Sequence, residues 1–216
     1  VAEQVMAYIL YFARRVDLQS ADMHDHSWNS RLMPGAKNRT LGLVGFGGIG
    51  TEVAKRAVPF GMKVIYFCRH PNPADDAAYG VQSVSMEELL KESDYVVAVV
   101  PLTDQTFHLF NEECIAQMKA GSVLINIARG PVVDEEALAQ ALASGHLGGC
   151  AVDVFPKEPC TDSVLTRYSN ALLTPHSATS TAENSKATNF AAANNLVNYL
   201  KKDIDAKYVV VQGTRY

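Results

Sequence analysis

The sequence predicts an α/β fold: a doubly wound parallel sheet, flanked by an N-terminal and a C-terminal crossing helix. Short apolar runs, typical of strands buried on both faces, alternate along the chain with segments of helical periodicity. The chain has 216 residues and is 48% hydrophobic, which suffices for one large domain or two small ones. Its apolar runs are far shorter than the roughly 20 residues that a membrane span needs.

The N-terminal part predicts a helix followed by a long connection. Val5, Tyr8, Ile9 and Phe12 recur at helical spacing and form one apolar face. Residues 17–38 are polar and punctuated by glycine and proline, so we expect them to cross the surface toward the first strand.

From residue 40 on, strands and helices alternate. The predicted strands are residues 41–46, 63–67, 95–100, 122–127, 150–154 and 171–174. The predicted helices are residues 48–60, a short helix opened by a capping box at residues 85–88, residues 111–118, residues 134–143 with Asp134 as N-cap, and a long helix opened by a capping box at residues 180–183 and ending near Leu200.

The turn after the first strand carries a phosphate-binding pattern. Residues 40–50 read TLGLVGFGGIG, in which Gly45, Gly47 and Gly50 have the spacing G-x-G-x-x-G. The first glycine permits a tight turn, the second lets a pyrophosphate approach the backbone, and the third lets helix and strand pack closely. Glycine spacing alone is a weak signal, but here strand, turn and helix agree with it. The sequence therefore predicts a Rossmann-type dinucleotide site, with the anion on the helix N-terminus.

Charge and cysteine usage narrow the class of protein. The formal net charge is −4 without a basic run, which disfavours nucleic acid or an anionic membrane as a partner. The scattered cysteines form no C-x-x-C pair and predict reduced thiols in a cytoplasmic protein. The cysteines are Cys68, Cys114, Cys150 and Cys160. No His, Cys, Asp or Glu cluster has metal-ligand spacing, so we expect no metal site.

Three charged or titratable residues follow neighbouring predicted strands, where ligands bind in such sheets. They are Arg129, Glu158 and His176. Arginine grips a carboxylate with a planar fork, histidine gives or takes an alcohol proton, and a carboxylate holds the histidine tautomer. The trio therefore suits reduction of a 2-oxo acid or the reverse reaction. Singly, Arg129 could salt-bridge a loop, Glu158 could be solvated and His176 could be a satisfied loop residue.

The chain resembles a known family over nearly its whole length, and four segments carry the resemblance. They are GFGGIG, INIARGPVVDEEAL at residues 125–138, AVDVFPKEP at residues 151–159 and TPHSA at residues 174–178. They are similar to the D-isomer-specific 2-hydroxyacid dehydrogenases of the glyoxylate and hydroxypyruvate reductase kind. The resemblance implies that this chain is their nucleotide-binding domain, an oxidoreductase component that transfers hydride between NAD(P)H and a small 2-oxo acid.

The resemblance also implies roles for individual residues. It makes Arg129 the carboxylate binder, His176 the acid/base and Glu158 the partner of His176. It places the nicotinamide carboxamide near Asp153 and Ile127. Further cofactor contacts are implied at Gly48, Ile49, Val100, Pro101 and the backbone after His176, as far as Ala178, in addition to Gly45, Gly47 and Gly50.

Cofactor preference depends on the end of the second strand. NAD-dependent members usually carry an acidic residue there, which binds the ribose 2′-hydroxyl. This chain has Cys68, Arg69 and His70 instead. Arg69 offers a partner to a 2′-phosphate, which favours NADP(H); the alternative is that Arg69 is a surface charge and NAD is used.

The family's chains are longer, with a substrate-binding lobe ahead of the nucleotide domain. We therefore interpret residues 1–216 as one domain with a dinucleotide-binding core at about 18–178, while residues 1–16 and 180–216 connect to a missing lobe. A fragment without that lobe is expected to bind cofactor but to be inactive or weak.

Family members pair through this domain, so a homodimer is expected. The alternative is a dinucleotide-sensing module of the corepressor type. The sequence does not specify which 2-hydroxy acid is used.

Overall fold

The computed structural model describes residues 1–201, 203 and 205. It contains two compact units, Val1–Ala178 and the segment from Thr179 on, and each is described by itself. The sheet and the predicted site residues belong to the first unit. Most of the tail that was expected to return to a second lobe, residues 203–216, lies outside the described residues.

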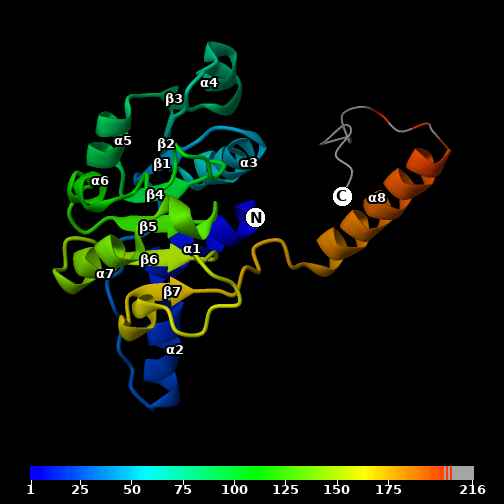
Figure 1. Cartoon of the computed structure of the whole chain (residues 1–216). Helices are drawn as coiled ribbons and strands as arrows, with labels where there is room; N and C mark the ends of the chain where they lie inside the picture. Colours follow the sequence, from blue (N-terminus) through cyan, green and yellow to red (C-terminus); the bar gives the residue numbers. More distant parts are fainter. Residues whose placement is uncertain (202, 204, 206–216) are drawn as a thin grey trace. The chain divides into compact units, whose positions relative to one another are not determined.

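The first unit is built on a parallel sheet (Figure 1). Within the described residues it has seven strands in the order β3-β2-β1-β4-β5-β6-β7, and every neighbouring pair runs parallel. The predicted doubly wound parallel sheet is therefore confirmed. The strands are β1 (Thr40–Val44), β2 (Lys63–Phe67), β3 (Gln82–Ser83), β4 (Tyr95–Ala98), β5 (Val123–Asn126), β6 (Gly149–Val152) and β7 (Ala171–Leu173).

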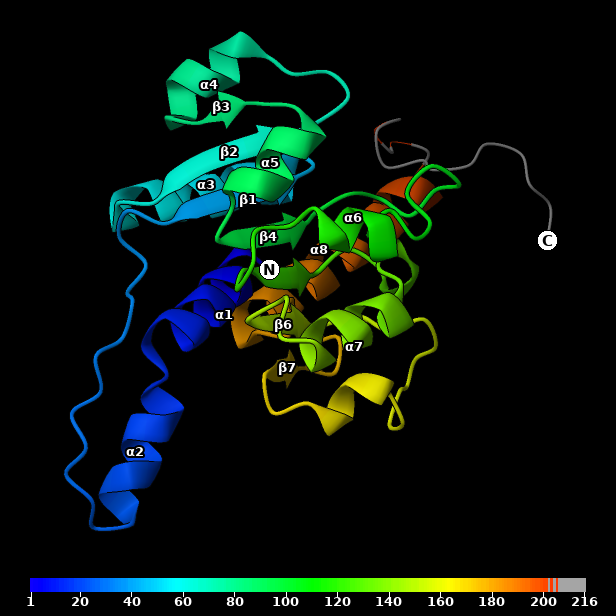
Figure 2. The same cartoon turned by 90° about the vertical axis from the view of Figure 1, so that its left-hand side faces the viewer.

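Helices cover both faces of this sheet (Figure 2). The core on one face includes side chains of α1 and α3, and the core on the other includes side chains of α5, α6 and α7. The helices are α1 (Ala2–Arg14), α2 (Val16–His24), α3 (Gly48–Ala57), α4 (Pro73–Tyr79), α5 (Met86–Glu92), α6 (Glu112–Ala116), α7 (Glu135–Ala143) and, in the second unit, α8 (Ala182–Leu200). Three short 3₁₀ turns accompany them in the described residues, η1 (Val58–Phe60), η2 (Gly130–Val132) and η3 (Val164–Arg167).

Most strands other than β3 are largely apolar because they contribute to both cores. In β4, Val97 packs into the core with α1 and α3, whereas Val96 and Ala98 pack into the opposite core. Successive strand side chains point to opposite faces, so a sheet buried on both sides needs a continuous apolar run.

Most predicted helix starts are confirmed by their caps. The Ser85 side chain accepts a hydrogen bond from the Glu88 backbone N–H, and the Asp134 side chain accepts from Glu136 and Ala137. The long helix begins one residue later than predicted, because Thr181 rather than Ser180 is its N-cap.

Two helices and one short strand were not predicted. The expectation of an irregular connection over residues 17–38 is wrong at its start, where α2 forms after Arg15 turns the chain with φ 41°. Since α2 buries no residue, its sequence shows no apolar stripe from which to read a helix. The short helix α4 likewise buries none, and β3 is only two residues long.

The strand order creates the predicted binding edge. The chain leaves β1 toward β2 and β3, and then crosses to β4 on the other side of β1. The carboxyl ends of β1 and β4 therefore border the crevice in which such sheets bind ligands.

Among the described residues, no helix has the combined length and apolarity required to cross a membrane.

Candidate active site

The glycine turn after β1 has the geometry of a phosphate cradle. Gly45 has φ 105°, and a Cβ placed on it would lie 2.7 Å from the Val99 carbonyl oxygen. A Cβ on Gly50 would lie 3.0 Å from the Gly45 carbonyl oxygen, so α3 packs closely against the turn. By contrast, a Cβ on Gly47 or Gly48 would meet open space. The backbone N–H groups that begin α3 therefore face room for an anion, and these residues fit the pyrophosphate of a dinucleotide.

Other predicted cofactor residues lie beside this turn. Val100 follows β4, and its Cγ1 would be 3.1 Å from a Cβ on Gly45. Arg69 follows β2, whose last residue, Phe67, accepts a hydrogen bond from the Gly45 N–H at 2.8 Å. Arg69, Pro101 and Ile49 are exposed. The structure thus brings the ends of β1, β2 and β4 together at one edge.

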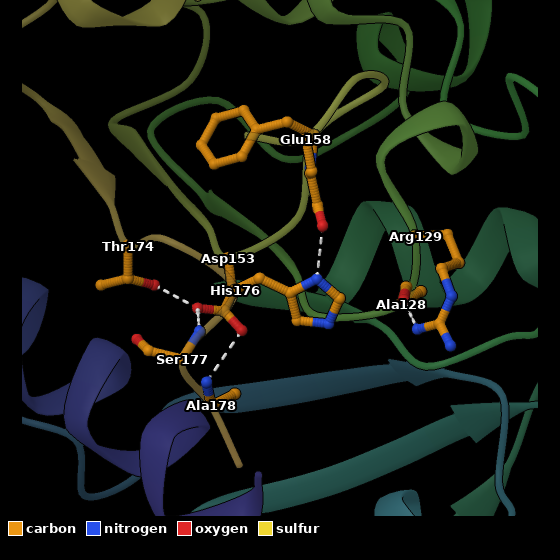
Figure 3. A network of polar contacts seen from close by, with 9 residues as sticks. Ala128, Arg129, Asp153, Glu158, Thr174, His176, Ser177 and Ala178 are labelled. Atoms are coloured by element: carbon orange, nitrogen blue, oxygen red, sulfur yellow. Dashed lines mark hydrogen bonds and ion pairs between the residues drawn. The ribbon is translucent and has the colours of Figure 1, made fainter. Parts of the chain in front are cut away.

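His176 and Glu158 meet across two loops at the same edge of the sheet (Figure 3). His176 follows β7 and Glu158 follows β6, and the His176 Nδ1 is 2.6 Å from Glu158 Oε2. The other Glu158 oxygen accepts a hydrogen bond from the Phe155 N–H at 2.9 Å. Because an ionised carboxylate only accepts, Nδ1 carries the shared proton and Nε2 remains available for a reacting group.

The surroundings favour the ionised form of Glu158. The hydrogen bond from His176 holds the pKa of the Glu158 carboxyl below its usual value, and the Phe155 N–H and the charge of Arg129 act in the same direction. The side chains of His176 and Glu158 remain 47% and 34% exposed. The pair is therefore assembled but open to water.

Arg129 lies on the loop after β5, and its guanidinium Nη1 donates to the Ala128 carbonyl oxygen at 2.7 Å. Its loop touches the Glu158 loop through the next residue, since a Cβ on Gly130 would lie 2.0 Å from the Phe155 carbonyl carbon. The two loops that carry the predicted carboxylate binder and the acidic partner of His176 are thus packed backbone to backbone.

Asp153 is only 1% exposed and accepts hydrogen bonds from the loop that carries His176 (Figure 3). Its Oδ1 accepts from Thr174 Oγ1 at 2.5 Å and from the Ser177 N–H at 2.8 Å, and its Oδ2 accepts from the Ala178 N–H at 3.0 Å. Ile127, which was also expected near the nicotinamide, is buried at the end of β5.

Sequence reasoning missed a residue that shapes the Arg129 loop. Asn126 ends the otherwise apolar strand β5 and is almost fully buried. Its side-chain amide donates to the Arg129 carbonyl oxygen and accepts from the Ala128 N–H, both at 3.1 Å. The signal was available, because an asparagine that ends an apolar run needs hydrogen-bond partners, and the loop that follows the strand can supply them.

Other candidate groups have ordinary structural partners. His146 Nε2 lies 3.0 Å from the Ile115 carbonyl oxygen, and His108 Nδ1 lies 3.5 Å from Asp134. All four cysteines are free thiols, and burial raises the pKa of Cys150 to about 12. Within the described ranges, no group of three or more His, Cys, Asp or Glu could hold a metal ion.

Gly130→Ala is expected to destabilise the domain by about 2–3 kcal/mol, because its methyl group would overlap the Phe155 backbone and force the two site loops apart. Urea unfolding at constant m measures the change. Gly48→Ala is the matched control: its methyl group meets open space, so we expect a change within about 0.5 kcal/mol. Equal unfolding midpoints for the two variants would contradict the close loop contact.

The fold and the glycine turn define a dinucleotide-binding α/β domain. The family model "D-isomer specific 2-hydroxyacid dehydrogenase, NAD binding domain" matches residues 6–178. The chain therefore belongs to the D-isomer-specific 2-hydroxyacid dehydrogenase family and contains its NAD-binding domain.

Individual relatives agree with this assignment. The chain is 38% identical to the glyoxylate reductase of Thermococcus litoralis, over 96% of this chain and 66% of the relative. It is 41% identical to the hydroxypyruvate reductase of Thermotoga maritima, over 85% of this chain and 60% of the relative. Among solved structures, the D-lactate dehydrogenase of Aquifex aeolicus, complexed with NAD and lactic acid, superimposes with a TM-score of 0.88 at 30% identity and covers 99% of this chain and 70% of that one. The chain thus spans less than two thirds of the length of the first curated relatives.

Proposed function

We propose that this chain is the cofactor-binding part of an oxidoreductase that transfers hydride between NAD(P)H and a small 2-oxo acid, with a D-2-hydroxy acid as the reduced product. The observation that carries the proposal is the His176–Glu158 pair on the same strand edge as the glycine turn. Glyoxylate and hydroxypyruvate are the first substrates to test, because two relatives are named as their reductases. The free thiols of all four cysteines support a cytoplasmic location.

Each residue of the trio has a distinct proposed task. His176 gives its Nε2 proton to the carbonyl oxygen as the alcohol forms, or takes it back in the reverse direction. Glu158 holds the ring orientation and stabilises the imidazolium. Arg129 binds the substrate carboxylate with guanidinium N–H groups that the Ala128 carbonyl oxygen leaves free. The bound nicotinamide supplies or accepts the hydride, and the protein orients it.

The cofactor residues form a path along the sheet edge. Gly45, Gly47, Gly48, Ile49 and Gly50 surround the proposed pyrophosphate position at the start of α3. From there the path continues toward the trio through the residues after β4 and β5 and the Asp153 loop, namely Val100, Pro101, Ile127, Asp153 and Ala178.

Turnover tests the proposal directly. NAD(P)H oxidation is measured with glyoxylate and hydroxypyruvate, using a form that also contains a substrate-binding lobe. A form that binds dinucleotide and changes its oligomeric state, without turnover of any small 2-oxo acid, would instead support a dinucleotide-sensing module.

We also propose a preference for NADP(H) over NAD(H). Arg69 is exposed at the end of β2, and no hydrogen bond or ion pair joins it to the rest of the described chain. Its neighbours Cys68 and His70 carry no negative charge. A guanidinium in this position is available to a 2′-phosphate, and residues 68–70 include no carboxylate that would repel it.

Arg69→Ala is expected to weaken NADPH binding about 10- to 100-fold, because a hydrogen bond to a charged group contributes about 1.5–3 kcal/mol. NADH binding should change less than about twofold. Fluorescence titration of the 216-residue chain gives both dissociation constants without requiring turnover. Lys63→Ala, at the other end of β2, is the control and should leave both constants unchanged. Tighter binding of NADH than NADPH by the unaltered chain would contradict the preference.

We propose in addition that the chain forms a homodimer through α2 and the segment after it. Arg31 pairs with Asp22 through two hydrogen bonds of 2.8 and 2.9 Å, which fasten this segment to α2. Large apolar side chains nevertheless remain exposed on α2 and on the segment after it, namely Val16, Leu18, Met23, Trp28 and Leu32. Such a group of exposed apolar side chains is typical of an interaction surface.

Replacing both Trp28 and Leu32 by glutamate is expected to raise the dimer dissociation constant at least about tenfold, because two large apolar contacts are lost. Sedimentation velocity over a concentration series measures this constant. Phe60→Glu, which changes an exposed aromatic residue away from α2, is the control. A monomeric unaltered chain would refute the proposed dimer.

A further inference from the structure

The hydroxyl group of Tyr8 in α1 touches the loop that carries His176. Tyr8 is 2% exposed, and its hydroxyl oxygen lies 2.5 Å from Thr174 Oγ1, although 166 residues separate the two in sequence. Burial raises the pKa of Tyr8, so the phenol stays protonated at neutral pH. The helix at the start of the chain is therefore joined by a polar contact to the proposed site.

The proton order in this contact follows from Asp153. Thr174 Oγ1 donates its proton to Asp153 Oδ1. A hydroxyl has one proton, so the Thr174 oxygen must accept the hydrogen bond that it shares with Tyr8. The order is thus Tyr8 to Thr174 to Asp153: Tyr8 donates, Thr174 accepts from Tyr8 and donates to Asp153, and Asp153 accepts.

Asp153 transmits this constraint to both sides of His176. It accepts from Thr174 before the histidine and from the Ser177 and Ala178 N–H groups after it. Between these anchors, His176 has φ 50°, a left-handed conformation that residues other than glycine seldom adopt. Such a conformation persists only where the surrounding contacts hold it.

We propose that Tyr8 is a positioning residue for His176, which acts through Thr174 and Asp153 to hold the imidazole against Glu158. The inference rests on the proposed function only in taking His176 as the acid/base. Tyr8 does not touch the reacting groups; it fixes the hydroxyl of Thr174 so that Asp153 keeps all three of its donors.

Tyr8→Phe tests the proposal because it keeps the ring and removes only the hydroxyl. We expect the Ser177 and Ala178 amide protons of the 216-residue chain to exchange with solvent about fivefold faster, the change that corresponds to one lost hydrogen bond. Thr174→Val should have the same effect, Thr174→Ser should preserve protection, and the double variant should exchange no faster than either single one.

Tyr66→Phe is the matched control. Tyr66 is also a buried tyrosine, and its hydroxyl donates to Asp76 Oδ1 at 2.7 Å, away from the His176 loop. This variant loses the same chemical group and one hydrogen bond, so it reports the general cost of removing a buried phenol hydroxyl. Its Ser177 and Ala178 amides should exchange as in the unaltered chain.

A second measurement separates positioning from a general loss of stability. The contact with His176 lowers the pKa of Glu158. If the loop loosens, Glu158 loses part of this contact. The titration midpoint of the Glu158 carboxyl, followed by NMR, should therefore rise in Tyr8→Phe and stay constant in Tyr66→Phe.

Unchanged exchange and an unchanged Glu158 midpoint in Tyr8→Phe would overturn the proposal. Neither measurement depends on turnover, so the positioning role of Tyr8 and the acid/base role of His176 are tested separately. If the protein shows no reductase activity but the loop still loosens in Tyr8→Phe, the link from Tyr8 to the His176 loop stands and only the catalytic role of His176 is rejected.

Discussion

Residues 1–216 alone are expected to bind NAD(P)H but to reduce 2-oxo acids at least about a hundredfold more slowly than a form with a substrate-binding lobe. The glycine turn proposed to receive the phosphates lies entirely within the chain. The proposed acid/base pair, in contrast, is open to water, since the His176 side chain is nearly half exposed. Without a second lobe, the proposed site is not closed over the substrate and water is not excluded, and misplacement by about 1 Å can cost about 10²-fold.

The comparison uses a chimera in which the lobe of the Thermococcus litoralis glyoxylate reductase precedes residue 1. Both proteins are assayed with glyoxylate and hydroxypyruvate, and cofactor dissociation constants are measured in parallel. Similar cofactor affinity with very different kcat/KM is the expected result. Equal turnover by the two forms would show that residues 1–216 enclose the substrate unaided.

His176→Gln is expected to lower kcat of the lobe-containing form by about 10²- to 10⁴-fold, the usual contribution of a general acid/base. Glutamine keeps a polar side chain that can donate to Glu158, but it has no proton that titrates near neutral pH. The cofactor dissociation constant should change less than about twofold, because the glycine turn lies at other strand ends. Steady-state kinetics and fluorescence titration give the two quantities.

His146→Gln provides the control for this prediction. The His146 ring contacts the Ile115 carbonyl oxygen, so this substitution also removes an imidazole with a polar partner, but outside the proposed site. We expect nearly normal kcat. A His176 variant that keeps more than about a tenth of the original kcat would exclude this residue as the acid/base.

The parts of the fold that could be predicted are those whose sequence pattern reports burial directly. β4 and β5 are buried at every position, so their apolar runs predict strands that are covered on both faces. The glycine turn was predictable because the chain must turn at φ 105° and pass close to Val99 there, which only glycine allows.

Elements without a buried face could not be predicted in this way. α2 and α4 bury no side chain, so neither leaves an apolar stripe in the sequence. The left-handed Arg15 between α1 and α2 is invisible to pattern reading, because arginine has no preference for that conformation.

Within the candidate site, strand ends indicated where to look but not how side chains pair. The sequence placed Glu158 and His176 after neighbouring strands, whereas their contact depends on the loop conformations around them. The link from Tyr8 to Thr174 was equally hidden, because Tyr8 looks in the sequence like an ordinary apolar position of an amphipathic helix.

The strand order also sets the direction and extent of any ligand at this edge. From β1, two strands, β4 and β5, must be crossed before β6 is reached, and parallel neighbours are about 4.8 Å apart. The glycine bend and the imidazole are thus separated by roughly 15–20 Å, counting three to four strand spacings to β6 or β7. We expect a ligand that serves both to be elongated and to lie across the strand ends, with the purine of the proposed dinucleotide toward β2 and its nicotinamide toward β6. Half of such a molecule, for instance an adenosine diphosphate, would occupy the bend and leave the other end empty.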